Sequence, residues 1–170
     1  ASSTMSTLKV DTIQHSGGTT GLTIDSSGRI KYPAQVRFLA IGSADGFLTT
    51  ATLPFPTVVR NIGSGYNNST YKFTAPISGC YFFNLHQYVK CDSGESIGLE
   101  FRKNDAELLT APKIYFHPDN MNSGGEIEQI QSTSAMIDLS ATDTIHVIYS
   151  GNGEYYSGNQ WSQFSGYLLG

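Results

Sequence analysis

The side chains that most often do chemistry are few in this sequence and lie far apart along it. The four histidines are His15, His86, His117 and His146, and the two cysteines are Cys80 and Cys91. The spacings typical of a zinc protease, an EF-hand, a paired-cysteine metal site and a serine nucleophile elbow are all missing. No segment has the period of a helix, so a phosphate loop leading into a helix is not expected either. We therefore predict that the protein is not an enzyme.

Two segments rich in aromatic and amide side chains are the best candidates for a binding site. Residues 112–125 and 151–161 carry turn-forming residues and are predicted to be long loops. Loops on a rigid scaffold commonly carry binding sites, and exposed aromatic rings can stack on sugar faces while polar groups bond the hydroxyls. The candidate receptor-binding residues are Tyr115, His117, Asp119, Asn120, Tyr155, Tyr156 and Trp161. The alternative is that these aromatic rings close the ends of the barrel or pack between subunits.

The two cysteines flank a segment, residues 81–90, that reads as a single strand. An extended strand rises about 3.3 Å per residue, which would place Cys80 and Cys91 about 35 Å apart. A disulfide requires Cα atoms within about 7 Å of each other. The sequence therefore predicts two unrelated free thiols.

The composition excludes several classes of partner. The net charge is -4, charged residues make up only 14%, and no stretch is strongly basic. Nucleic acid and anionic membrane surfaces are therefore not expected partners, because clustered lysine and arginine supply most of that affinity. No apolar run approaches the roughly 20 residues that span a bilayer, and the first ten residues lack the pattern of a secretory signal.

From residue 36 onward the chain reads as short strands separated by turns. The predicted strands cover residues 36–42, 57–62, 69–75, 79–90, 96–103, 127–139 (one or two strands), 144–150 and 162–170. In the strand 79–90 the odd-numbered side chains are the more apolar, and Ile97, Leu99 and Phe101 alternate in the same way, so both sets should face a core. The pattern predicts an all-β fold, an antiparallel jelly-roll sandwich of about ten strands.

Residues 1–35 differ from the rest and are predicted to form a separate segment before a head of residues 36–170. Their apolar residues fall in two small clusters, one around Leu8 and Val10 and the other around Leu22 and Ile24. Such short strands cannot bury enough surface to be stable alone. We expect a β-rich segment that needs partner chains, such as copies of itself, and that serves for trimerisation and attachment.

Several motifs in the head carry a resemblance to a known family. The fold markers are Gly65, Tyr66, Asn67, Phe73, Pro76, Gly79, Tyr81, Phe83, Phe164 and Gly166. With Asn61 and the apolar strands around Asp143, they resemble the globular head of complement component one q, in the tumour-necrosis-factor-like jelly-roll group. The sequence departs from that pattern at Thr142, where the family usually has glycine before the aspartate. The resemblance implies a tight homotrimer with a three-fold axis.

The same resemblance bears on metal binding, because relatives sometimes hold calcium near the trimer axis. Calcium takes six to eight oxygen ligands. Asp92, Glu95, Asp119 and Glu154 lie on predicted loops, and three chains could contribute together. Nothing in the spacing requires calcium, so we predict no metal and no other cofactor, with calcium the ion that these residues would suit.

The opening of the chain supplies a biological context. Residues 5–33 resemble the start of phage virion and tail-fibre proteins. We expect a homotrimeric tail-fibre or virion adhesin that binds a bacterial surface glycan or protein, with residues 5–33 contacting other virion proteins. It would be located on the virion tail and act outside the host cell. Two alternatives stay open, a structural virion protein that binds only other virion proteins and a secreted complement-like or cytokine-like ligand.

Overall fold

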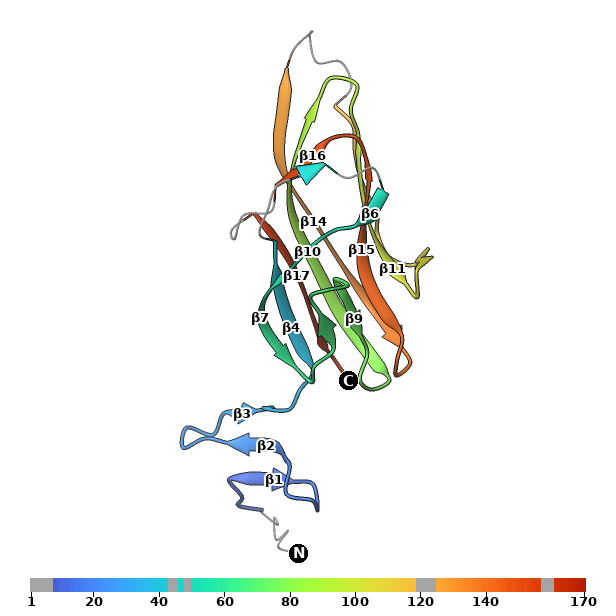
Figure 1. The fold of residues 1–170 in the computed structure, drawn as a ribbon. Coiled ribbons are helices and arrows are strands. Elements are labelled where there is room, and N and C mark those ends of the chain that lie inside the picture. The colour runs from blue at the N-terminus through green and yellow to red at the C-terminus, as the bar shows by residue number, and fades with distance from the viewer. Residues whose placement is uncertain (1–7, 43–45, 48–49, 119–124, 157–160) are drawn as a thin grey trace, which may run out of the picture. The chain divides into compact units, whose positions relative to one another are not determined.

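The computed structural model describes residues 8–42, 46–47, 50–118, 125–156 and 161–170 (Figure 1). Within these ranges the regular structure consists of β-strands, and no helix is long and apolar enough to cross a membrane. The chain divides into two compact units, Ala1–Gln35 and Val36–Gly170, which are described separately. The all-β prediction is confirmed.

The N-terminal unit is a small antiparallel meander. Its strands are β1 (Thr12–Gln14), β2 (Thr20–Ile24) and β3 (Ile30–Lys31), in that order in the sheet. Asp25 organises the β2–β3 turn, because its carboxylate accepts hydrogen bonds from the backbone nitrogens of Ser27 (2.9 Å) and Arg29 (3.0 Å). The large apolar side chains that remain exposed are Leu8, Ile13, Ile30 and Tyr32. Val10, Leu22 and Ile24 are half-buried, and none of the described apolar side chains of this unit is fully buried.

The second unit is a sandwich of two antiparallel sheets. Sheet I contains, in spatial order, β7 (Thr57–Ile62), β4 (Arg37–Ile41), β17 (Ser162–Leu168), β10 (Gly79–Asp92) and β14 (Glu126–Leu139), with β16 (Glu154–Tyr156) and β5 (Gly46–Phe47) extending it beside the upper part of β10. Sheet II contains β8 (Tyr66–Asn67), β9 (Lys72–Thr74), β15 (Thr144–Gly151), β11 (Ile97–Lys103) and β13 (Ile114–Phe116), with β6 (Thr50–Thr52) beside β15 and β12 (Ala106–Glu107) beside β11. Each sheet has seven strands, several of them only two or three residues long, so the antiparallel jelly roll is confirmed with more strands than the ten or so that the pattern predicted.

Alternating side chains build the core between the two sheets. Along β10 the buried side chains are those at odd positions, including Tyr81, Phe83 and Leu85, as predicted. The ring of Phe83 meets Phe73 of sheet II at 5.5 Å and Phe101 of sheet II at 6.4 Å between ring centroids. Because each sheet contributes one apolar face, the opposite face of each sheet points away from the core.

Several fold markers act through close packing. A Cβ atom on Gly65 would lie 2.5 Å from the Phe73 ring, and one on Gly166 would lie 2.6 Å from the Phe83 ring. Both positions therefore exclude any larger residue without a shift of the aromatic core. Asn61 ties down the turn that follows β7, because its side chain both accepts from the Tyr66 nitrogen (3.1 Å) and donates to the Tyr66 oxygen (2.8 Å).

Several segments differ from the sequence prediction, and the short strands β5, β6, β8 and β12 lie where no strand was predicted. The predicted loop 112–125 contains strand β13, and the predicted loop 151–161 contains strand β16. The predicted strand 69–75 is shortened to β9, because Tyr71 has a left-handed φ of 58° that keeps the chain in a turn until Lys72. Such short strands are set by the neighbouring strand rather than by their own sequence, so the local pattern underestimates them.

Thr142 occupies the position where the resembling family usually has glycine. Its backbone is strained, with a φ of 76°. A β-branched residue is strongly disfavoured in that left-handed region. Asp143 beside it holds the turn: hydrogen bonds from Asn104, Lys103 and the Ser140 nitrogen lower the pKa of Asp143 to about 2.

Replacing Thr142 by glycine should raise the free energy of unfolding by about 1 kcal/mol, because relief of the strained φ exceeds the entropy that glycine adds to the unfolded chain. Chemical denaturation of both proteins at one concentration measures the difference. Thr142→Ala is the matched control and should gain much less, because alanine keeps the Cβ atom that makes a left-handed φ unfavourable. Equal stability of the glycine variant and the parent protein would contradict this reading of the turn.

Candidate functional site

The predicted receptor-binding residues separate onto different parts of the head. Tyr115 and His117 come together on sheet II, with ring centroids 6.3 Å apart, and both side chains are exposed. Tyr156 and Trp161 lie beside Tyr88 on sheet I instead. Tyr155 is only 6% exposed and packs against Tyr149 in the core. Asp119 and Asn120 lie outside the described residues. The two candidate segments therefore lie on two separate surfaces, and Tyr155 is a core residue.

The first surface is an aromatic cluster on the outer face of sheet I. The Tyr88 ring lies 5.4 Å from Tyr156 and 5.0 Å from Trp161, measured between ring centroids. The Tyr88 hydroxyl donates a 2.6 Å hydrogen bond to Glu128, and this bond together with burial raises the pKa of Tyr88 to about 12. The four side chains surround an open hollow of about 200 Å³. The phenol therefore stays protonated, and the hollow has mostly aromatic walls.

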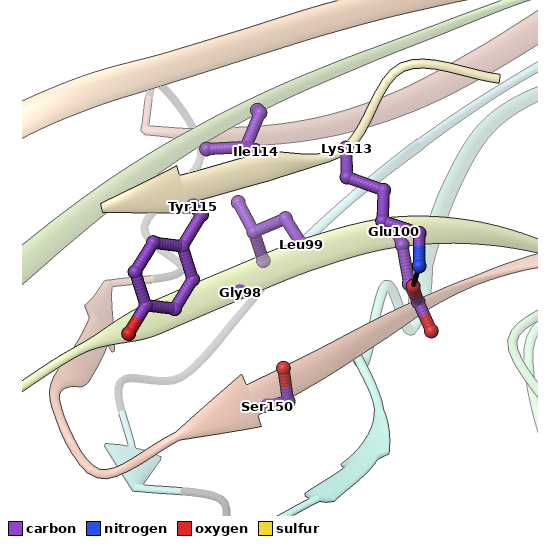
Figure 2. Close-up of a pocket in the computed structure, with 7 residues that line it drawn as sticks. All are labelled: Gly98, Leu99, Glu100, Lys113, Ile114, Tyr115 and Ser150. Atoms are coloured by element: carbon purple, nitrogen blue, oxygen red, sulfur yellow. Dashed lines mark ion pairs between the residues drawn. The ribbon is translucent and has the colours of Figure 1, made fainter. Parts of the chain in front are cut away.

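The second surface is a hollow on the outer face of sheet II, shown in Figure 2. It is lined by Gly98, Leu99, Glu100, Lys113, Ile114, Tyr115 and Ser150 and has a volume of about 210 Å³. Strand pairing creates it: Gly98 on β11 lies opposite Tyr115 on one side and opposite Ser150 on the other. Because Gly98 has no side chain, the surface is notched between the tyrosine ring and the serine hydroxyl.

An ion-pair network closes one end of this second hollow. Lys113 lies 3.0 Å from Glu100 and also contacts Glu107, while Arg102 contacts Glu100 from the same strand. Burial acts to raise the pKa of Glu100, but the hydrogen bonds from Lys113 and Arg102 outweigh it, so the pKa lies below its usual value. Glu100 is therefore a fixed, ionised acceptor at the rim of the hollow.

The sequence reading missed most of these lining residues because they lie on strands rather than loops. The alternation in β11 placed Gly98 and Glu100 on the face away from the core, which was the available signal. Their meeting with Tyr115 depends on the pairing of β11 with β13, which no local pattern reveals.

The carboxylates suggested for calcium do not gather in the part of the chain that the structure describes. Glu95 accepts a 2.9 Å hydrogen bond from the Asp92 nitrogen and closes a turn, while Glu154 lies 3.6 Å from Lys90. Asp119 lies outside the described residues. Among residues that are described, no three histidine, cysteine or acidic side chains come close enough together to hold a metal ion. The three described carboxylates, those of Asp92, Glu95 and Glu154, therefore form no calcium site with one another.

Two histidines and both cysteines lie on strands of the sandwich. His146 is buried on sheet II near Lys72 and Arg102, and burial lowers its pKa, so it is neutral near pH 7. His86 lies 3.0 Å from Ser132 on the neighbouring strand. Cys80 and Cys91 are free thiols near opposite ends of β10. Neither histidine is placed in an assembled catalytic group by these contacts.

Comparison with known proteins shows which family and which solved structures this fold is similar to. The family model described as the C1q domain matches residues 38–169. Among solved structures, the globular domain of zebrafish complement 1qA protein superposes with a TM-score of 0.58 at 15% identity, covering 80% of this chain and 98% of that chain. Eiger TNF from S. frugiperda gives a TM-score of 0.63 at 12% identity, covering 81% and 94%. Murine APRIL gives 0.59 at 14% identity, covering 79% and 99%. At these identities the structures show the shared jelly roll, and the family match over most of the chain shows that the protein belongs to the C1q domain family.

Proposed function

We propose that this protein is the homotrimeric attachment head of a phage tail fibre or virion, which binds a glycan or protein on the bacterial surface. Domains of the C1q and tumour-necrosis-factor-like group commonly form homotrimers, and they typically bind ligands or serve structural roles rather than catalyse reactions. One observation carries the proposal: within the described residues, the outer face of sheet I exposes large apolar side chains at two places, with polar pairs such as Asn84 and Ser134 between them.

The lower part of that face is a cross-strand row of large side chains. Phe82 on β10 lies opposite Met136 on β14 and opposite Tyr167 on β17, with 5.4 Å between the Phe82 and Tyr167 ring centroids. Met136 is 71% exposed and Tyr167 is 42% exposed in one chain. Monomeric proteins rarely leave such a patch open, so a second copy of the chain is its natural cover.

The aromatic cluster lies farther along the same face, beyond the polar pairs of Asn84 with Ser134 and His86 with Ser132. Ile130 on β14 lies opposite Tyr88, and Trp161 is 46% exposed beside it. Interface cores are rich in tyrosine, tryptophan and methionine and poor in charge. The hollow beside Tyr88 would then receive a side chain from a neighbouring subunit, which explains these aromatics as contacts between subunits.

The N-terminal unit supports the virion part of the proposal. Its exposed side chains, including Leu8, Ile13 and Ile30, need cover from other chains. Residues 5–33 resemble the start of phage fibre proteins, so the chains that cover these side chains would be neighbouring copies and other virion proteins. This segment would hold the head on the virion while the head faces the host.

Two measurements test the proposal. Light scattering on the full chain should give three times the 18.4 kDa of one chain, and a version that begins at Val36 should remain trimeric through sheet I. Fluorescently labelled protein should then bind susceptible bacteria and not resistant ones. A monomer in both versions would refute the assembly, and a trimer that stains no bacteria would favour a structural virion protein.

The C1q domain itself favours a second candidate, a secreted complement-like ligand. The two candidates predict different surroundings for the gene. Neighbouring tail genes would support the fibre head, whereas a collagen-like stretch in the same reading frame would support the secreted ligand.

A further inference from the structure

We propose that the hollow on the outer face of sheet II binds one uncharged pyranose ring of a surface glycan. This deepens the proposed function and rests on it, because a trimer built through sheet I leaves the outer face of sheet II open. Three features that meet at one place carry the proposal (Figure 2). They are the exposed ring of Tyr115, the notch at Gly98, and a polar rim where the charges of Glu100 and Lys113 are paired.

The ring is Tyr115, which remains 73% exposed although it lies opposite Gly98. An aromatic residue opposite a glycine in a sheet often covers that glycine and loses its own exposure. Here the ring stays largely free, so its surface and the notch at Gly98 form two adjoining walls. The carbon-bound hydrogens on a sugar face carry slight positive charge and are attracted to the negative face of such a ring.

The notch sets the size of the ligand. A Cβ atom at Gly98 would lie 2.4 Å from the Ser150 hydroxyl oxygen, so even a methyl group would fill the notch. The hollow of about 210 Å³ is smaller than the roughly 300–1,000 Å³ of pockets that hold drug-sized ligands. It therefore suits a single ring with the rest of the glycan in solvent.

Polar groups at the rim match hydroxyls rather than a charged group. The Ser150 hydroxyl lies on one side, and the Glu100 carboxylate offers a fixed acceptor at the end, where Lys113 offers a donor. A carboxylate and an ammonium group placed 3.0 Å apart can accept from and donate to neighbouring hydroxyls of one sugar.

The charge balance selects an uncharged sugar. Lys113 pairs with Glu100 and Glu107, and Arg102 pairs with Glu100, so two cations face two carboxylates. An acidic sugar would have to take a cation away from one of these carboxylates, at the cost of an existing ion pair. A neutral ring leaves the network intact and uses only its spare hydrogen-bonding capacity.

Three such hollows on a trimer would make weak binding effective. A single shallow site for one sugar is expected to bind with a dissociation constant on the order of millimolar. Simultaneous contact of three sites with a dense glycan layer can increase the overall affinity by about a hundredfold or more without any new contact.

Saturation-transfer NMR on the trimeric full chain tests the inference directly. The probes are the methyl glycosides of glucose, galactose, mannose and N-acetylglucosamine, with glucuronic acid and N-acetylneuraminic acid as charged counterparts. At least one uncharged glycoside should bind, and Tyr115→Ala and Gly98→Ala should each weaken it by about tenfold or more. Gly98→Ala keeps the strand, because only the Ser150 side chain has to rotate. Leu109→Ser, a change at an exposed residue outside the hollow, should leave binding unchanged.

The possible outcomes separate this inference from the proposed function. Stronger binding of the acidic sugars would overturn the assigned site, and so would binding by Gly98→Ala and Tyr115→Ala that equals that of the unmodified protein. If none of the glycosides binds while the trimer still stains susceptible bacteria, the sugar inference fails and the attachment function stands. If the trimer binds neither bacteria nor sugars, both proposals fail together.

Discussion

Replacing Phe164 by alanine should lower the free energy of unfolding by about 3–5 kcal/mol, the usual cost of removing a fully buried phenylalanine ring. Phe164 is completely buried at the centre of sheet I. The neighbouring rings, with centroids 4.9 to 6.1 Å away, are Phe38, Phe55, Tyr66, Phe83 and Phe101. The cavity cannot close easily, because four of these rings lie on strands of the two sheets and Phe55 lies in the connection between β6 and β7.

Denaturant unfolding measures this loss, with both proteins compared at the same chain concentration because assembly contributes to apparent stability. Tyr115→Ala serves as the matched control, since its ring is mostly exposed and its removal should cost no more than about 0.5 kcal/mol. A loss below about 1 kcal/mol for Phe164→Ala would mean that this aromatic core does not join the two sheets as described.

Burial of Phe164 and of the odd positions of β10 was predictable from sequence. When apolar and polar residues alternate along a strand, only one register places all the apolar side chains on the buried face. The same rule assigned Gly98 to the outer face of β11. What alternation cannot supply is the identity of the neighbouring strand. The meeting of Gly98 with Tyr115 depends on β13, a three-residue strand inside a predicted loop.

The aromatic residues of the candidate site show the same limit in another form. Tyr155 and Tyr156 are adjacent in sequence, so they point to opposite faces of β16: Tyr155 enters the core while Tyr156 joins Tyr88 outside it. A loop prediction gives neighbouring residues equal exposure, whereas a strand separates them. The candidates in the predicted loop 151–161 therefore separate, because pairing with β10 makes residues 154–156 a strand.

The second prediction with a large effect concerns assembly. Replacing Met136 by aspartate should convert the trimer into monomers, so that the mass in solution falls to that of one chain. In the proposed interface Met136 would be covered by another subunit, next to Phe82 and near Tyr167. Three buried carboxylates without cationic partners would each cost several kcal/mol, which exceeds what a modest interface can offset.

Light scattering at several concentrations measures the result, and two variants complete the design. Met136→Leu should remain trimeric, because it preserves the apolar volume. Leu109→Asp should also remain trimeric, because it places the same charge on an exposed residue away from sheet I. A trimeric Met136→Asp protein would show that the outer face of sheet I is not the contact. Dissociation of both aspartate variants would instead show that added charge alone disrupts assembly. Dissociation of Met136→Asp alone would mean that the apolar row on sheet I holds the subunits together, since the two aspartate variants carry equal charge and differ in the face that bears it.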